Sequence, residues 1–241
     1  MSGPVTYTRN ESFSRIVMDD GKANVMSIEM LNALHAAFDE AEHDKALVLL
    51  SARGKHFSGG FDLNVFAKGT AQDQYLMLKG GAELALRILS FPTPVVTACQ
   101  GNAYPMGAFL ILSSDFRLAA EGNYRIGLNE VAIGLAAPRF AIEVARQRLL
   151  PAYFNRTVTT GEMFEPAEAV TAGFFDRLVP AADLERAALE KAEALTKINM
   201  ASHATMKMRA RGETIALIRR VIDEDITPRY GEERVAARAQ G

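Results

Sequence analysis

Apolar and polar positions follow two different periods along the chain, and the change of period separates strands from helices. Residues 5–8 and 13–18 carry short strand patterns that resemble a β-hairpin. After Ser27, which can cap the start of a helix, apolar residues recur at helical spacing as far as Ala41. The run 46–50 is apolar throughout, which predicts an interior strand.

The middle of the chain continues this alternation. A helical pattern over 72–89 ends at two closely spaced prolines, before an apolar strand at 95–99. A strand pattern at 115–120 is followed by a helical pattern at 139–149 and a short strand at 175–179. Strands that alternate with helices predict an α/β fold in which the helices pack outside the sheets.

From residue 182 onward the pattern is helical throughout. Asp183 can cap one helix, and a second helix holds the apolar residues between 215 and 222. There is no strand pattern here, no internal repeat and no low-complexity linker. We therefore divide the chain into a core, 1–181, and a C-terminal helical region, 182–241.

Composition narrows the class of protein. The chain has 241 residues, of which 49% are hydrophobic, enough to bury one sizeable core. The net charge of -2 disfavours binding to nucleic acid or to an anionic membrane surface. We see no signal-peptide pattern and no apolar stretch near the roughly 18 residues of a membrane span. The single Cys99 suits a reducing compartment, so we expect a cytoplasmic protein with a buried strand thiol.

Several common kinds of site are missing from the sequence. There is no glycine-lysine phosphate loop, no dinucleotide fingerprint and no histidine pair at helical spacing, so we predict no metal site. Two glycine-containing segments remain, 56–63 and 101–109, and each follows a strand pattern. Glycine lets a backbone approach a ligand and turn its N–H groups outward. Either segment alone is also compatible with an ordinary turn between a strand and a helix.

Taken together and in order, five segments resemble the crotonase superfamily. They are 22–27 (KANVMS), 57–63 (FSGGFDL), 101–108 (GNAYPMGA), 126–134 (IGLNEVAIG) and 168–180 (EAVTAGFFDRLVP). The resemblance covers essentially the whole chain. It implies a spiral of ββα units in two nearly perpendicular sheets, and a C-terminal region that builds a trimer or hexamer. It also implies an acyl-CoA thioester substrate with no separate cofactor, because coenzyme A is part of the substrate.

The same resemblance assigns an oxyanion hole to the backbone N–H groups of Phe61 and Met106. These groups would stabilise negative charge on the thioester oxygen, and each such donor is typically worth roughly 10²–10³ in rate. Because the donors are main chain, we expect the side chains to vary freely and, with Tyr104 and Phe109, to shape the acyl pocket. For Asp62 we prefer a capping role at the next helix to a catalytic one.

The resemblance also assigns the contacts to coenzyme A and to the rest of the substrate. Lys22 is a reasonable phosphate partner, although exposed lysines are mostly solvated. The other substrate-binding residues that it implies are Ala23, Val25, Phe57, Gly59, Gly60 and Gly107.

The number of carboxylates in the site distinguishes the reactions of the superfamily. A typical hydratase holds a water between two glutamates, but the position of the first is Phe109, which cannot exchange a proton. The second is Glu130, and 134–140 lacks the glycine pair usual in hydratases. Both features resemble the mitochondrial Δ3,Δ2-enoyl-CoA isomerases. One carboxylate suffices for such an isomerase, since it can take a proton from C2 of a 3-enoyl thioester and return it to C4.

Several alternatives stay open. The chain could be an enoyl-CoA hydratase of fatty acid β-oxidation that works with Glu130 alone, or a homologue that binds acyl-CoA without catalysis. Glu83, in the helix before the proline pair, could supply a second acid. An RNA-binding relative is disfavoured by the acidic charge. A serine peptidase using Ser113 or Ser114 lacks a nucleophile elbow. The sequence does not fix the acyl chain length.

Overall fold

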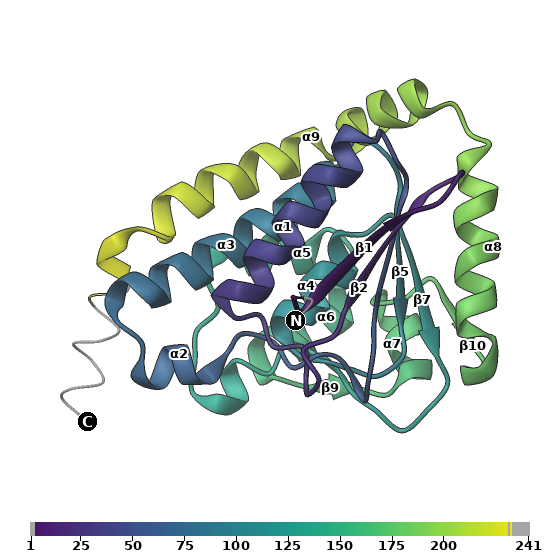
Figure 1. The fold of residues 1–241 in the computed structure, drawn as a ribbon. Coiled ribbons are helices and arrows are strands. Elements are labelled where there is room, and N and C mark those ends of the chain that lie inside the picture. The colour runs from purple at the N-terminus through teal and green to yellow at the C-terminus, as the bar shows by residue number, and fades with distance from the viewer. Residues whose placement is uncertain (1–2, 231, 233–241) are drawn as a thin grey trace.

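The large sheet begins with the hairpin that the sequence predicts. The computed structural model describes residues 3–230 and 232 (Figure 1). The order of the six strands in this sheet is β1-β2-β3-β5-β7-β10, and every neighbouring pair is parallel except the hairpin β1–β2. The strands are β1 (Val5–Arg9), β2 (Ser14–Met18), β3 (Val48–Ala52), β5 (Val95–Cys99), β7 (Phe116–Ala120) and β10 (Arg177–Val179).

A second, smaller sheet has the order β4-β6-β8-β9. Its strands have only two or three residues each: β4 (His56–Ser58), β6 (Asn102–Ala103), β8 (Ile126–Gly127) and β9 (Met163–Phe164). Strand pairs β3/β4, β5/β6 and β7/β8 each give one strand to the large sheet and the next to the small sheet. Each pair is followed by a helix, so the structure confirms the expected ββα spiral.

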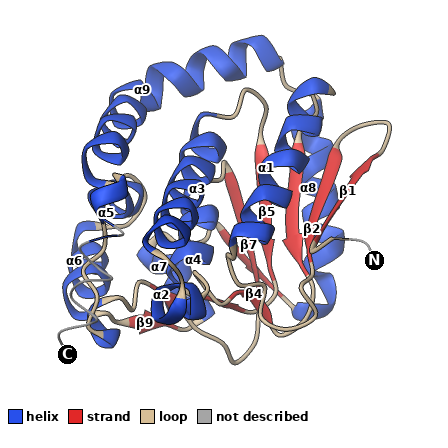
Figure 2. Cartoon of the chain, turned by 60° about the vertical axis from the view of Figure 1, so that its left-hand side comes forward, coloured by secondary structure: helices blue, strands red, loops and turns tan. Residues whose placement is uncertain are grey.

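The helices of the core lie between these strands and against their faces (Figure 2). Ser27 caps α1 by accepting a hydrogen bond from the backbone N–H of Met30 at 3.1 Å, as predicted. The apolar patterns did not predict α6 and α7, and the only sign of α2 was the expected capping role of Asp62. The helices of the core are α1 (Ile28–His43), α2 (Leu63–Lys68), α3 (Ala71–Ser90), α4 (Pro105–Ser113), α5 (Arg139–Arg146), α6 (Pro151–Thr160) and α7 (Pro166–Ala172).

The central strands β3 and β5 of the large sheet are buried on both faces along most of their length, which explains why they read as continuous apolar runs. Val48 and Leu50 point into the main core, whereas Leu47 and Leu49 belong to a second cluster under α8 (Leu184–Thr196). The apolar run 46–50 predicted a strand two residues earlier than β3. The two extra residues, although buried, precede the first strand pairing.

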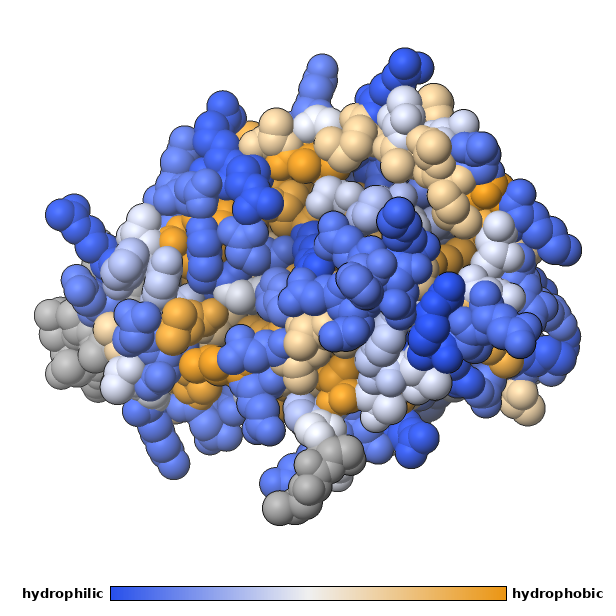
Figure 3. Space-filling view, turned by 45° about the horizontal axis from the view of Figure 1, so that its top comes forward, coloured by the Kyte–Doolittle hydropathy of each residue, from blue (hydrophilic) through white to orange (hydrophobic). Residues whose placement is uncertain are grey.

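The last helix, α9 (Met200–Asp225), packs against α3 and α5 of the same chain. Buried Lys207 anchors it: its Nζ donates to Asp115 Oδ2 at 2.7 Å and to the backbone carbonyls of Phe91 and Thr93. Figure 3 looks onto this side of the molecule and shows hydrophilic side chains interspersed with smaller apolar areas. The predicted helical region is thus observed as far as the described residues extend, and 231 and 233–241 lie outside them.

Two further expectations concern membrane-spanning helices and the oligomeric state. No helix of the described residues combines the length and the apolar composition that a membrane span requires. The trimer or hexamer expected for the C-terminal region stays a prediction.

Candidate active site

The two glycine-containing segments meet at the end of the small sheet. Parallel pairing of β4 with β6 aligns them, and the N–H of Tyr104 donates to the carbonyl of Ser58 at 3.0 Å. A Cβ atom added at Gly107 would lie 2.7 Å from the Cβ of Ser58, so a larger residue would push the segments apart. Gly60 has φ +84°, the left-handed region that favours glycine. Glycine is therefore required on both sides of this junction.

Two backbone N–H groups remain without partners at the junction. Pro105 is the first residue of α4 and has no N–H, which makes the N–H of Met106 the first one that this helix offers. On the other segment, the N–H of Met26 donates to the carbonyl of Gly60 at 2.8 Å and fixes the peptide before Phe61. Within the described part of the chain, the N–H groups of Phe61 and Met106 donate no hydrogen bond. Phe61 lines the cavity beside the junction, whereas Met106 is buried directly behind the lining residues Tyr104 and Pro105.

The side chains beside these N–H groups pack against α3. A Cβ atom added at Gly81 would lie 2.5 Å from the ring of Phe61 and 3.1 Å from Sδ of Met106. Gly81 thus lets α3 lie directly over the junction. The sequence reasoning missed this residue, because its role depends on a helix–loop contact that no local pattern encodes.

A cavity of about 290 Å³ opens beside the junction. Helices α2, α3, α4 and α5 and the segment 129–138 contribute to its walls. Among the predicted substrate-binding residues, Gly59, Gly60, Tyr104 and Phe109 line this cavity, and so do Phe61 and Glu130. The rest of the lining is almost entirely apolar, a composition typical of a pocket for an apolar ligand.

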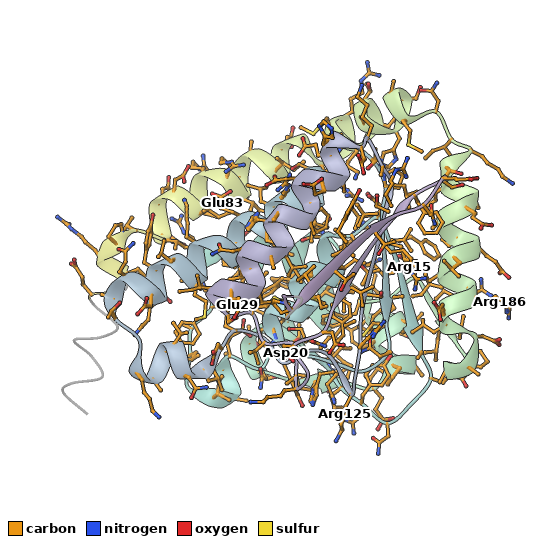
Figure 4. All side chains as sticks on the ribbon, in the orientation of Figure 1. Arg15, Asp20, Glu29, Glu83, Arg125 and Arg186 are labelled. Carbon is orange, nitrogen blue, oxygen red and sulfur yellow. The ribbon has the colours of Figure 1, made fainter. Side chains whose placement is uncertain are left out.

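The other predicted binding residues lie around this cavity and not in its wall. The N–H of Gly59 donates to the carbonyl of Ala23 at 2.7 Å, and Val25 also contacts Gly59. Lys22 is exposed nearby, in a loop that the Asp20 carboxylate holds through the N–H groups of Lys22 and Val25 (Figure 4).

Two of the predicted binding residues are buried in other ways. Phe57 is fully buried in the core. Gly107 packs against Ser58. Their contribution is to shape the junction and not to line the cavity.

Glu130 is the one carboxylate in the described lining of this cavity. It immediately precedes a short 3₁₀ helix (Val131–Ile133), and its backbone carbonyl accepts the N–H of Leu135 at 2.8 Å. Burial raises the pKa of the Glu130 carboxyl from its ordinary value to about 7. The residues described by the structure place no lysine, arginine or histidine in an ion pair with it. Glu130 can therefore take up and release a proton near neutral pH.

Phe109, the position at which the resemblance implies the first glutamate of a hydratase, lines the cavity. Its ring is buried and meets that of Phe140 edge to face, with the centroids 5.8 Å apart. A benzene ring there can neither exchange a proton nor accept a hydrogen bond from water. The site therefore presents one acid–base group opposite two main-chain donors.

Segment 134–138, which follows the 3₁₀ helix, is fixed at its far end by an ionic tether to α9. Asp225 accepts the backbone N–H of Arg139, the first residue of α5, and the Arg139 guanidinium pairs with both Asp225 and Glu224. The C-terminal helix thus holds one wall of the cavity in place.

Glu83 does not reach the cavity. Its Oε2 accepts a hydrogen bond from Arg219 at 2.7 Å, and Lys79 lies 3.5 Å from its Oε1. Figure 4 places Glu83 on the side of α3 that faces α9. Its carboxylate is therefore engaged in attaching α9 and is not a second acid for this site.

Two structural interpretations are confirmed. The Asp62 carboxylate caps α2 by accepting the N–H of Asn64 at 2.9 Å. Cys99 is fully buried, and burial raises the pKa of its thiol to about 12, so it is not a nucleophile at neutral pH.

Known proteins resemble this chain over most of its length. The family model described as enoyl-CoA hydratase/isomerase matches residues 8–227. A solved structure of an enoyl-CoA hydratase/isomerase family protein from Pseudomonas syringae is 38% identical, with a TM-score of 0.90, and the match covers 92% of this chain and 96% of that one. An enoyl-CoA isomerase from Mycobacterium tuberculosis is 41% identical, with a TM-score of 0.88 and coverage of 92% and 97%.

A curated relative carries a third activity. The carnitinyl-CoA dehydratase of Salmonella typhi is 30% identical over 210 residues, which are 86% of this chain and 80% of that protein. The names of similar proteins thus include isomerase, hydratase and dehydratase, and another solved structure of the same Mycobacterium tuberculosis protein names it a probable enoyl-CoA hydratase.

Proposed function

Since the chain belongs to the enoyl-CoA hydratase/isomerase family, within the crotonase superfamily, we propose that it is an enoyl-CoA isomerase of fatty acid metabolism. It moves the double bond of a 3-enoyl-CoA to the 2-trans position. The observation that carries this proposal is the single carboxylate: Glu130 lines the cavity, and Phe109 stands where hydration would require a second one.

The thioester binds with its carbonyl oxygen at the junction of the two glycine segments. The N–H groups of Phe61 and Met106, which have no partner among the described residues, donate to this oxygen. When a proton leaves C2, negative charge moves onto the oxygen, and these fixed donors stabilise the dienolate without having to reorganise.

Glu130 carries the proton. As a carboxylate it removes a proton from C2, and the electron pair delocalises through the C3–C4 double bond onto C4. The resulting carboxylic acid then returns the proton to C4, which leaves the double bond between C2 and C3. A pKa of about 7 suits both steps, since the group accepts a proton readily and releases it readily near neutral pH.

The apolar walls protect the dienolate from water. Phe61, Phe109 and Leu135 line the cavity around Glu130. Excluding water strengthens the interaction with the two N–H donors and prevents loss of the proton to solvent.

Replacing Glu130 by glutamine tests this function, because the change keeps the shape of the side chain and removes the base. With trans-3-hexenoyl-CoA, we expect formation of the conjugated 2-enoyl product to fall by roughly 10²–10⁴ in Glu130→Gln. Glu143→Gln is the matched control, since Glu143 lies on α5, pairs with Arg146 and is not part of the cavity wall. The control should isomerise the substrate like the wild type.

A parallel assay with crotonyl-CoA separates the alternatives. Hydration by the wild type above the Glu130→Gln background, without isomerisation, would replace our proposal by a hydratase that uses one glutamate. Tight binding of acyl-CoA without turnover of either substrate would show a non-catalytic homologue.

A further inference from the structure

A second cavity adjoins Glu130 and has no part in the chemistry described above. Its volume is about 220 Å³. It shares Glu130, Ala136 and Ala137 with the first cavity. Helices α5 and α6 supply much of the remaining wall, through Ala141, Ile142 and Val158. The two spaces are therefore separated by one carboxylate side chain and by two residues whose side chains are single methyl groups.

The lining of this second cavity suits hydrocarbon and not water. Glu130 is the one titratable residue among the described residues that line it. The hydroxyl of Thr157, which precedes the lining residue Val158, is already engaged, since it accepts the N–H of Leu128 at 3.1 Å and donates to the carbonyl of Glu162 at 3.1 Å. An ordered water needs two to four polar partners, and apolar cavities without them bind apolar ligands.

The position of this cavity relative to the reacting carbons follows from the proposed function, on which this inference rests. Glu130 must reach both C2 and C4, so these carbons lie against its carboxylate. The chain from C5 onward then continues past the carboxylate, away from the thioester. The second cavity shares Glu130 with the first one, so it lies against the same carboxylate that this chain must pass.

We propose that this second cavity binds the distal part of the acyl chain, so that the preferred substrates are unbranched 3-enoyl thioesters that extend well beyond C4. The first cavity alone, at about 290 Å³, falls just below the range of about 300–1,000 Å³ found for pockets that bury a drug-sized ligand, and the second adds most of its volume again.

Each methylene that enters the second cavity raises the affinity. Burying one methylene group is worth roughly fourfold in binding. Dodecanoyl-CoA should therefore bind at least about tenfold more tightly than hexanoyl-CoA, because several of its additional carbons leave water.

Filling the second cavity tests the proposal directly. Ala141 lines this cavity and not the first, so Ala141→Leu places apolar atoms where the distal chain would lie. We expect the preference for dodecanoyl-CoA over hexanoyl-CoA, measured by titration calorimetry, to fall by about tenfold or more. The kcat/KM ratio for trans-3-dodecenoyl-CoA over trans-3-hexenoyl-CoA should fall in the same proportion.

Ala152→Leu is the matched control, because it makes the same change at an exposed position of α6 outside both cavities. It should keep the wild-type preference. If Ala141→Leu does not fold, Ile142→Phe fills the same cavity from a partly exposed position.

The outcomes distinguish this inference from the function on which it rests. A wild type that binds the two saturated thioesters equally, or a cavity-filling variant that keeps the wild-type preference, overturns the second cavity as the acyl site even if isomerisation is observed. A chain-length preference that Ala141→Leu abolishes, in a protein that isomerises neither enoyl thioester, supports the binding site and removes the proposed reaction.

Discussion

The two sides of the cavity differ in the kind of atoms that we expect to take part in the reaction, which are main-chain atoms on one side and a side-chain carboxylate on the other. In the proposed reaction, paired strands and the start of α4 position the N–H groups of Phe61 and Met106 on one side, and only main-chain atoms take part there. On the other side, the proposed proton transfer depends on one side chain, that of Glu130, beside a short 3₁₀ helix. The position of the two N–H donors depends on close backbone packing, so we expect it to tolerate changes of side chain. The proton transfer depends on the identity and environment of Glu130.

The side of the cavity that carries the Phe61 and Met106 N–H groups should fail when its packing is disturbed, with a loss second only to that expected for Glu130→Gln. In Gly107→Ala the new Cβ would meet Ser58 at 2.7 Å and push the first turn of α4 away from the other segment. Displacing the N–H of Met106 removes one donor to the oxyanion, so kcat for trans-3-hexenoyl-CoA should fall by roughly 10²–10³.

Gly80→Ala is the control for this substitution. A Cβ at Gly80 on α3 makes only ordinary contacts, the nearest at 3.6 Å from Leu31. Thermal unfolding of both variants separates a loss of fold from a loss of the donor. A Gly107→Ala protein that folds and turns over at the wild-type rate would show that the junction does not bind the thioester oxygen.

The Glu130 side of the cavity should respond to pH. The N–H groups of Phe61 and Met106 do not titrate, so a change of pH leaves them unaffected. Because the pKa of Glu130 is about 7, the base is protonated below that value, and kcat/KM should drop about tenfold for each pH unit below 7. Glu130→Gln should lose this dependence together with most of its activity. A profile that stays flat down to pH 5 would exclude Glu130 as the base.

The same raised pKa has a consequence for stability. Between the ordinary pKa of about 4.5 and the folded value of about 7, the unfolded chain ionises Glu130 while the folded protein retains the proton. The contribution of Glu130 to stability is therefore greatest below pH 4.5 and is lost as the pH rises to 7. Glu130→Gln should melt at a higher temperature than the wild type at pH 8, and the difference should shrink at pH 4.

Changing the side chains of Phe61 and Met106, whose N–H groups are the proposed donors, should have the smallest effect. Phe61→Leu and Met106→Leu keep the N–H groups and exchange one apolar side chain for another, so we expect kcat/KM to change by less than about tenfold. Steady-state kinetics with trans-3-hexenoyl-CoA measure this. A hundredfold loss in Met106→Leu would mean that its side chain, and not its N–H, is what the reaction needs.

The sequence predicted the parts of the fold that have long, regular patterns. The strands β3 and β5 and the helices α1 and α3 gave the clearest apolar patterns, because they bury many apolar side chains in the core. The strands of the small sheet have two or three residues and no period that can be recognised. Helices α6 and α7 are short and begin with a proline, which reads equally well as part of a loop.

The candidate site also contains residues that could be located from the sequence and residues that only the structure reveals. The resemblance to a known family located Glu130, Phe109 and the two glycine segments, and the structure brings these together around one cavity. Contacts between distant segments left no signal in the sequence. Gly81 over the junction and the cavity between α5 and α6 appear only when the chain has folded.

The anchoring of α9 also bears on the order in which the protein can be completed during synthesis. Asp115 is nearly buried, and its partners Lys207 and Arg211 lie more than 90 residues later in the chain. These ion pairs can form only after residue 211 has been synthesised and has left the ribosome. The carboxylate of Asp115 therefore keeps its contact with water until α9 docks, and the docking of α9 is the step that completes this part of the structure.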